Sequence, residues 1–90
     1  MITGQIDPNS VAGRGLEVVG IKVPESASVV GRPMRDLQIP YGAQLALIIS
    51  SSGRTEVPTD DTVIEAEDEV IAVSPVESTQ TLWETLTELR

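Results

Sequence analysis

Two arginines next to a turn-forming segment are the residues best suited to bind an anion. Arg32 and Arg35 lie shortly before residues 39–42, which read I-P-Y-G. Because a guanidinium donates several hydrogen bonds in one plane, the pair could bind an anion beside the turn. The alternative is that both arginines are solvated or pair with Asp36 and nearby acids. The candidate ligand-binding residues are Arg32, Arg35, Ile39, Pro40, Tyr41 and Gly42.

A run of carboxylates within residues 60–69 is the second feature with usable chemistry. Hard divalent cations such as Ca²⁺ bind carboxylate oxygens, and Asp60, Asp61 and Asp68 are the candidate ligands. Their spacing does not follow a calcium-loop motif. A loop this acidic can equally be solvated, so both interpretations stay open.

The chain has no histidine and no cysteine. These residues supply the commonest general base, the usual partner of a nucleophilic serine and the usual zinc ligands. Residues 50–52 are all serine, but they lack the glycines that flank a nucleophile elbow. We therefore expect no enzymatic activity.

Charge and hydropathy restrict the partners. Fourteen acidic and six basic residues give a net charge of −8, which disfavours nucleic acid and anionic membrane surfaces. No apolar run approaches the roughly 18 residues that span a bilayer. We expect a cytoplasmic protein without nucleic acid or membrane insertion. Ninety residues form one small domain with a marginal core, so a homodimer is expected to supplement it.

A sheet must position these residues. Strands are predicted at residues 16–23, 45–49, 54–57 and 70–73, and a short helix is predicted within 28–38. Residues 45–49 do not alternate, which is typical of a strand buried on both faces. The order β-α-β-β-β-α predicts an α/β (α+β) fold, a small two-layer sandwich with a mixed, mainly antiparallel sheet and helices on one side. Residues 1–15 are predicted to be a flexible arm or linker to a domain at 16–90.

The last helix has the clearest start signal. Ser74 is the predicted N-cap, Pro75 the first helical residue and Glu77 the second half of a capping box. The apolar stripe that follows includes Trp83 and Leu86, the residues that we expect in a dimer interface. For Trp83 a place in the core and a contact with a ligand are the alternatives.

Four short motifs follow one another along most of the chain. They are V-G-R-P-M-R-D-L at 30–37, P-Y-G-A at 40–43, Pro58 followed by D-T-V-I at 61–64, and E-A-E-D at 65–68. In this order they resemble the TrkA-C (RCK-C) family, the C-terminal regulatory domain of potassium channels and transporters, over roughly residues 16–89. Two positions depart from the family pattern. Ser50 stands where an arginine is frequent, and Glu67 replaces a turn glycine, which is expected to alter that loop's backbone.

The resemblance implies a ligand-binding and dimerisation domain that gates potassium transport through an effector-induced rearrangement. It implies a membrane-embedded potassium channel or transporter subunit as partner, and a cytoplasmic location at the inner face of the membrane. The implied effector is cyclic di-AMP, another nucleotide or a divalent cation. The alternatives are a ligand-free structural dimerisation module of a membrane transporter and an acidic divalent-cation-binding domain.

Overall fold

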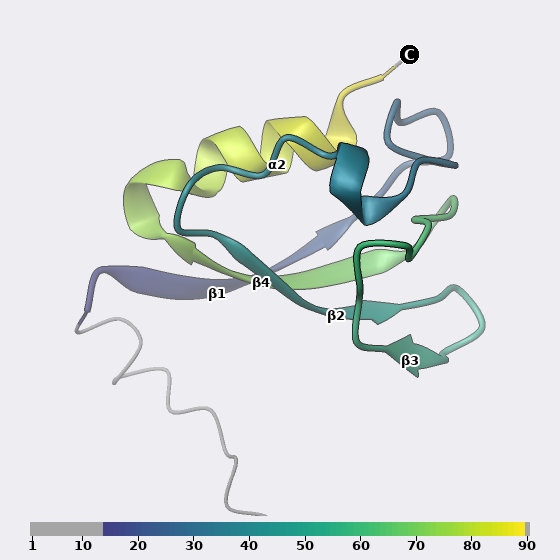
Figure 1. Cartoon of the computed structure of the whole chain (residues 1–90), viewed down its shortest axis with the longest axis horizontal. Helices are drawn as coiled ribbons and strands as arrows, with labels where there is room; N and C mark the ends of the chain where they lie inside the picture. The colour runs from purple at the N-terminus through teal and green to yellow at the C-terminus, as the bar shows by residue number, and fades with distance from the viewer. Residues whose placement is uncertain (1–13, 90) are drawn as a thin grey trace, which may run out of the picture.

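The fold is built on one four-stranded sheet, in a computed structural model that describes residues 14–89. The strands are β1 (Leu16–Lys22), β2 (Gln44–Ile49), β3 (Thr55–Glu56) and β4 (Glu69–Pro75). They lie in the order β1-β4-β2-β3, and every neighbouring pair is antiparallel. The last strand along the chain is therefore an inner strand, with β1 and β2 parallel to each other on its two sides (Figure 1).

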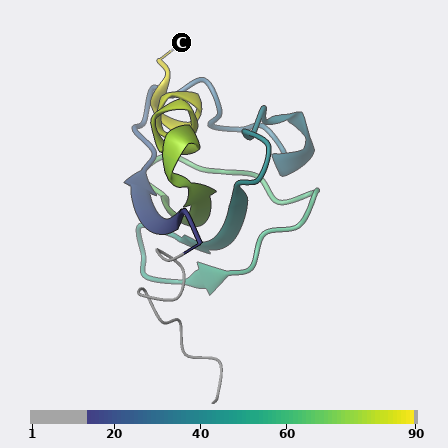
Figure 2. The ribbon, with the colours of Figure 1, turned by 90° about the vertical axis from the view of Figure 1, so that its left-hand side faces the viewer.

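The helices lie on one face of this sheet. They are the 3₁₀ turns η1 (Met34–Asp36) and η2 (Val76–Ser78) and the helix α2 (Thr79–Thr87). Figures 1 and 2 show η1 and α2 over the same face, which confirms the predicted two-layer α+β fold. The sheet is wholly antiparallel rather than mixed, and the predicted short helix is a single 3₁₀ turn. Of the predicted arm, residues 1–13 lie outside the described part of the chain.

The core lies between the helices and the covered face of the sheet. β1 alternates as predicted, with Ile21 buried and Lys22 exposed. From above, α2 contributes Leu82 and Leu86, which lie on one helical face because they are four positions apart. This pair therefore fixes which side of α2 turns toward the sheet. The other buried apolar residues are Val23, Ala27, Val29, Leu45, Ile48, Ile64, Val70 and Ala72.

The predicted burial of β2 on both faces is wrong. Leu45 and Ile48 are buried, whereas Leu47 and Ile49 are only partly buried, and the helices cover one face alone (Figure 2). The register of β2 against β4 shifts between Leu45 and Leu47. This bulge explains the missing alternation, because an extra residue puts Leu45 and Ile48 on the same face although they are three positions apart.

The predicted start of the last helix is also wrong. Ser74 is buried within β4, where it pairs with Glu17 of β1, and its Oγ donates a hydrogen bond to the carbonyl oxygen of Pro75. α2 begins only at Thr79, whose hydroxyl donates to a carboxylate oxygen of Glu17. Pairing with β1 extends through Pro75, so the proline ends a strand instead of opening a helix.

The hairpin between β2 and β3 has the predicted turn but a shorter second strand. The N–H of Gly53 donates to the carbonyl oxygen of Ser50 at 2.9 Å, and the N–H of Ser50 donates to that of Arg54 at 2.8 Å. Gly53 has a φ of 91°, as the glycine of such a bulged hairpin requires. β3 contains only Thr55 and Glu56.

The acidic loop before β4 has a left-handed residue that is not glycine. Glu67 has a φ of 68°, and the N–H of Asp68 donates to the carbonyl oxygen of Glu65 across the turn. Glycine or asparagine usually fills this third turn position. Contrary to the expectation from its side chain, Glu67 thus has the left-handed backbone that a glycine would adopt.

Candidate ligand-binding site

The segment that carries the two arginines is held against the loop that precedes residue 65. Three backbone hydrogen bonds join them, from Gly31 N–H to the oxygen of Ile64 (2.8 Å), from Met34 to Thr62 (2.8 Å) and from Arg35 to Asp60 (3.1 Å). Pro33 forms an isolated antiparallel bridge with Val63 and precedes η1 with an extended backbone. This ladder places η1 beside the edge of the sheet that ends in β3.

Thr62 orders the loop at residues 60–64, which accepts these three hydrogen bonds. Its side chain is buried, and its Oγ1 accepts a hydrogen bond from the N–H of Thr59 at 2.9 Å. The N–H of Thr62 donates to the carbonyl oxygen of Thr59 at 3.0 Å. Threonine commonly closes turns in this way, so η1 and the loop form one ordered unit.

The predicted P-x-G turn stands at the entry to β2. The N–H of Ala43 donates to the carbonyl oxygen of Pro40 at 3.1 Å, and Gly42 has a φ of 88°. A Cβ at Gly42 would lie 3.0 Å from Cγ of Pro75, so both the dihedral angle and the space favour glycine. Tyr41 is 99% exposed, so its ring is available to a ligand or a second protein.

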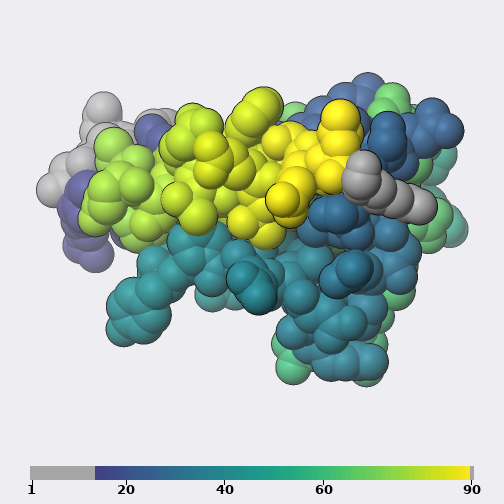
Figure 3. Space-filling model, turned by 90° about the horizontal axis from the view of Figure 1, so that it is seen from above, coloured from purple at the N-terminus to yellow at the C-terminus, as the bar shows by residue number. Residues whose placement is uncertain are grey.

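Two hollows lie on opposite sides of the segment that joins η1 to this turn. One, of about 220 Å³, is lined by Met34, Ile39, Leu45, Pro58, Thr59 and Asp60. The other, of about 300 Å³, is lined by Arg32, Asp36, Leu37, Gln38, Thr85 and Glu88. Leu37 and Gln38 line the larger hollow, and Ile39 lines the smaller one. Seen from above, the teal segment between β1 and β2 projects beside the ridge of α2 in two lobes with a notch between them (Figure 3).

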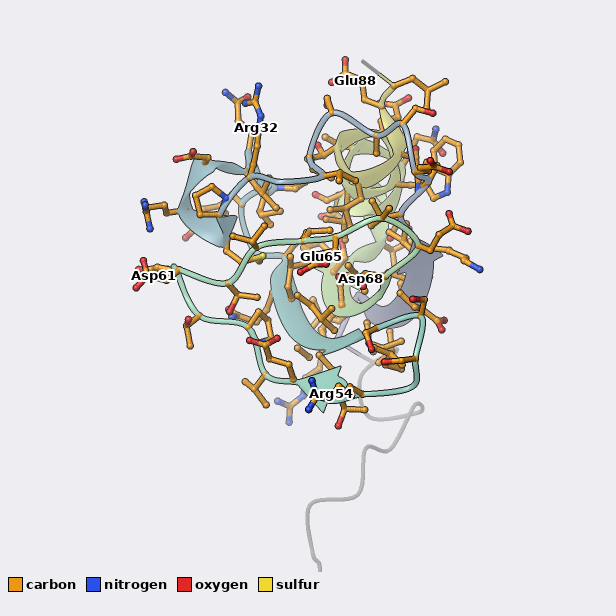
Figure 4. All side chains as sticks on the ribbon, turned by 90° about the vertical axis from the view of Figure 1, so that its right-hand side faces the viewer. Arg32, Arg54, Asp61, Glu65, Asp68 and Glu88 are labelled. Atoms are coloured by element: carbon orange, nitrogen blue, oxygen red, sulfur yellow. The ribbon has the colours of Figure 1, made fainter. Side chains whose placement is uncertain are left out.

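Arg32 supplies the positive charge of the larger hollow. Figure 4 shows Arg32 and Glu88 projecting at the same end of the molecule. Within residues 14–89, Arg32 forms no salt bridge, and Asp36 and Glu88 share its hollow. The hydroxyl of Thr85 donates to the carbonyl oxygen of Gln38 at 3.4 Å, which ties α2 to this wall. The hollow is lined by one cationic side chain, Arg32, and two anionic ones, Asp36 and Glu88.

Arg35 and Asp61, which the sequence places in two different candidate sites, pair with each other. Their side chains are 57% and 88% exposed, and such a pair contributes little to stability. It nevertheless engages the guanidinium of Arg35. The structure therefore gives Arg35 the alternative role, a pair with a nearby acid, and leaves Arg32 at the hollow.

The three candidate metal ligands lie apart. Asp60 lines the smaller hollow, Asp61 binds Arg35, and Asp68 is buried, with its Oδ2 accepting the N–H of Glu65. Figure 4 shows Asp61 well away from Asp68. Among the described residues no three acidic groups converge as metal ligands would. The divalent-cation site therefore stays a prediction, and the structure does not bring its three candidate ligands together.

The two candidate interface residues differ in exposure. Trp83 is 51% exposed and does not fill the core, whereas Leu86 is fully buried beneath α2. Since an interface residue must be accessible in the monomer, Leu86 belongs to the core instead. Trp83 keeps a free face that a partner could cover.

Several lining residues of the hollows carry no signal in the sequence. Pro58 and Thr59 come from the loop after β3, and Thr85 and Glu88 come from the end of α2. They reach η1 only because the chain folds back twice. No local pattern marks them as neighbours of residues 32–39.

The sequence of the chain is similar to that of known proteins. Residues 18–86 match the model of the TrkA-C domain family. The chain is 32% identical over 81 residues to a Trk system potassium uptake protein TrkA homolog of Archaeoglobus fulgidus, covering 90% of this chain and 18% of that protein. A TrkA homolog of Pyrococcus abyssi is 27% identical over 71 residues, covering 79% and 31%. The chain thus spans less than a third of the length of these curated relatives.

Solved structures share the fold. An RCK domain described with cda has a TM-score of 0.67 at 19% identity and covers 77% of this chain and 96% of that one. The GsuK channel bound to NAD has a TM-score of 0.68 at 15% identity and covers 83% and 14%. None of the helices within residues 14–89 is long and apolar enough to cross a membrane.

Proposed function

The chain belongs to the TrkA-C domain family, and from this premise we propose that it is a regulatory, non-enzymatic domain of a potassium transport system. One observation carries the proposal: two hollows flank the segment that leads to the exposed Tyr41 turn. Both are lined by residues of the motif at 30–37, and the smaller one is also lined by Ala43 of the motif at 40–43. We assign effector binding to this region.

The size of the hollows favours a ligand shared between two copies. Small-molecule sites commonly enclose about 300–1,000 Å³, and these hollows measure about 220 and 300 Å³. A dinucleotide would stay partly exposed on one copy and would be enclosed by a second copy that faces the same turn. A ligand with two equal halves suits such a two-fold arrangement, because each copy presents the same residues.

The side chains around the hollows favour a nucleotide. Tyr41 can stack on a base, and Arg32 can donate to a phosphate oxygen. Asp36 and Glu88 can accept hydrogen bonds from sugar hydroxyl or base amino groups. Cyclic di-AMP and NAD are the first candidates, since solved relatives with this fold are described with cda and with NAD.

The mechanism is a shift between two arrangements of the paired domains. An effector that binds one arrangement more tightly raises its population, and the attached chain passes the change to a membrane-embedded potassium channel or transporter subunit. The domain acts in the cytoplasm at the inner face of that membrane.

Isothermal titration of the 90-residue chain with cyclic di-AMP and NAD is the direct test. Loss of base stacking costs about 1–3 kcal/mol, so we expect Tyr41→Ala to weaken binding by roughly 10-fold or more. Arg32→Ala should weaken it similarly. Arg54→Ala is the matched control, because it removes the same charge from the β2–β3 hairpin outside both hollows.

Two results would contradict this assignment. If neither nucleotide gives a heat of binding, the effector role is excluded. Equal losses of affinity in Arg32→Ala and Arg54→Ala would show a non-specific charge effect. Calcium binding that Asp61→Asn abolishes would favour the divalent-cation alternative.

A ligand-free dimerisation module is the second candidate. The pairing of Arg35 with Asp61 favours it, because that pair removes one of the two guanidiniums from the anion site. The thermal midpoint separates the candidates, since a ligand that binds only the folded chain must raise it. A midpoint that depends on protein concentration and not on any nucleotide would support the second.

A further inference from the structure

A third hollow, of about 600 Å³, lies between the β2–β3 hairpin and the acidic loop that precedes β4. Its lining comes from residues within 48–56 and 63–68, and we call it the hairpin hollow. Small-molecule sites commonly enclose about 300–1,000 Å³. The hairpin hollow is therefore large enough for a small ligand on one copy of the chain.

This hollow is separate from the two hollows beside η1. None of its lining residues lines either of them. The Tyr41 turn precedes β2 and the hairpin follows it, and the six residues of β2, at about 3.3 Å each, put roughly 20 Å between the two ends. A molecule in the hairpin hollow is thus a second ligand, which goes beyond the nucleotide effector.

Opposite charges line the hairpin hollow without forming pairs. Arg54 lies on the hairpin, and Glu65 and Asp68 lie on the loop above it (Figure 4). Within residues 14–89, Arg54 forms no salt bridge with either carboxylate. The third carboxylate of the lining, Glu56, accepts a hydrogen bond from the hydroxyl of Thr62 at 3.4 Å. A hollow that keeps opposite charges apart suits a ligand that carries both.

Asp68 presents one oxygen to this hollow. Its side chain is buried, and its Oδ2 accepts the N–H of Glu65 at 2.9 Å. Its Oδ1 accepts no hydrogen bond from residues 14–89, and no side-chain oxygen of this part of the chain is sealed off without a partner. Oδ1 therefore opens on the hollow. Because a nearly buried carboxylate without a cation is costly, a positive group of a ligand would stabilise it.

The hairpin supplies donors for a carboxylate. Oγ of Ser50 accepts the N–H of Arg54 at 3.1 Å and lies 2.9 Å from Oγ of Ser52, so the backbone that carries Arg54 is fixed. Ser51 lines the same hollow, and its hydroxyl has no hydrogen-bond partner within residues 14–89. A guanidinium and a hydroxyl together bind a carboxylate through charge-assisted hydrogen bonds.

The hollow also has an apolar lining. Ile48, Val63 and Ala66 contribute it, and Val63 is 43% exposed. The aliphatic stem of a charged group packs on such a surface while its charged end stays at polar groups. The ligand therefore needs a short aliphatic part as well as its charges.

We propose that the hairpin hollow binds a free basic amino acid of the lysine class. Its carboxylate binds Arg54 and Ser51, and its two ammonium groups bind Glu65 and Asp68. The charges match, because one guanidinium and two carboxylates without a cation meet one carboxylate and two ammonium groups. A divalent metal ion fits less well, since no three acidic groups among the described residues converge as metal ligands would.

Three relatives of lysine test this assignment, because each lacks one charged group. Cadaverine lacks the carboxylate, 6-aminohexanoate lacks the α-ammonium group and norleucine lacks the side-chain ammonium group. In isothermal titration of the 90-residue chain we expect saturable binding of L-lysine. Each relative should bind more weakly by roughly 10-fold or more, as the loss of one charged hydrogen bond requires.

Two variants test the walls of the hollow separately. Arg54→Ala should weaken L-lysine by roughly 10-fold but tighten cadaverine, because it removes a positive charge beside a dication. Glu65→Gln should weaken L-lysine and cadaverine alike. Glu77→Gln is the matched control, since Glu77 is exposed on η2 and lines none of the three hollows. Asp68 stays unaltered, because it also fixes the acidic loop.

Filling the hollow is an independent test. Ser50→Arg places a guanidinium in the same hollow as Glu65 and Asp68, where it takes the place of the ligand's ammonium groups. We expect this variant to lose L-lysine binding while circular dichroism shows an unchanged fold.

Three results would overturn the proposal. The first is no saturable binding of L-lysine tighter than about 1 mM. The second is cadaverine binding as tight as that of L-lysine, which would show a polyamine site. The third is an equal loss of affinity in Glu65→Gln and Glu77→Gln, which would show a general charge effect. The nucleotide titrations use other residues, so this proposal and the effector proposal can fail separately.

Discussion

Two turns in this domain both need a residue with a left-handed backbone, but they place different residue types at that position. Residues 40–43 and 65–68 each close a turn with a left-handed third residue, at Gly42 with a φ of 88° and at Glu67 with a φ of 68°. The first turn uses a residue type that accepts this conformation without cost. The second uses one that resists it. The first turn can be recognised from its own sequence, whereas the second can be explained only by the residues around it in the structure.

The surroundings of the acidic turn account for its shape. The N–H of Glu67 donates to the carbonyl oxygen of Val23, and the N–H of Val23 donates to that of Asp68. The buried carboxylate of Asp68 accepts the N–H of Glu65 at 2.9 Å. These bonds over-determine the turn, which is how strained positions persist in folded proteins.

Gly42→Ala should give the largest effect, because it tests a turn that relies on its residue type. A left-handed alanine costs about 1–2 kcal/mol, and its Cβ would meet Pro75 at 3.0 Å. We expect a loss of about 2–3 kcal/mol in chemical denaturation. Gly31→Ala is the control, since Gly31 has a φ of 87° and nothing within 4 Å of its Cβ position. Equal losses would show that the contact with Pro75 adds nothing.

Asp68→Ala should come next, because it removes the acceptor that fixes the acidic turn. The loss of a hydrogen bond to a charged group costs about 1.5–3 kcal/mol, and the N–H of Glu65 would be left without its partner. Asp68→Asn keeps an acceptor oxygen and should retain most of the stability in the same denaturation experiment. If both variants lose equally, the negative charge of Asp68 matters rather than the hydrogen bond.

Glu67→Gly should have the opposite sign. It relieves a left-handed glutamate, at the expense of extra freedom in the unfolded chain, for a net gain of about 0.5–1 kcal/mol. Glu67→Ala keeps the Cβ and removes only the exposed contact with Lys22, so its midpoint should not change. A gain in both variants would trace the effect to charge instead of the backbone.

Tyr41→Ala should have the smallest effect on stability, below about 0.5 kcal/mol, because the ring is 99% exposed. Its effect should appear only in nucleotide titrations. Together with Gly42→Ala, this variant separates the residue that shapes the first turn from the residue that the turn presents. A loss of stability as large as that of Gly42→Ala would show that the ring packs on the protein.

The fold could be predicted where short-range rules dominate. Alternation in β1 and the P-x-G turn gave correct elements because each depends on a few neighbouring residues. The start of α2 could not be predicted, since Ser74 satisfies a helix rule but pairs with Glu17 from the other end of the chain. β2 was misjudged for a related reason: its bulge against β4 is a property of the pair.

The candidate site followed the same division. Arg32, Ile39 and Tyr41 lie on one continuous segment, so the sequence could place them near one another. Arg35, in the 3₁₀ turn after Pro33, pairs with Asp61 from the loop after β3, and no short-range rule predicts that pair. The far walls of the hollows come from the loop after β3 and from α2, and only the three-dimensional fold reveals them.

The inner position of β4 also governs the order in which the sheet can be made. Leu16 pairs with Pro75 and Lys22 with Glu69, so the strand that joins β1 to β2 is the last to leave the ribosome. Until β4 is synthesised, β1 and β2 have no common neighbouring strand, and their apolar residues cannot be buried against it. Closing such long loops late is entropically expensive and slows folding. We therefore expect the folding of the nascent domain to depend on its final third, and the unfinished domain to be a target for chaperones.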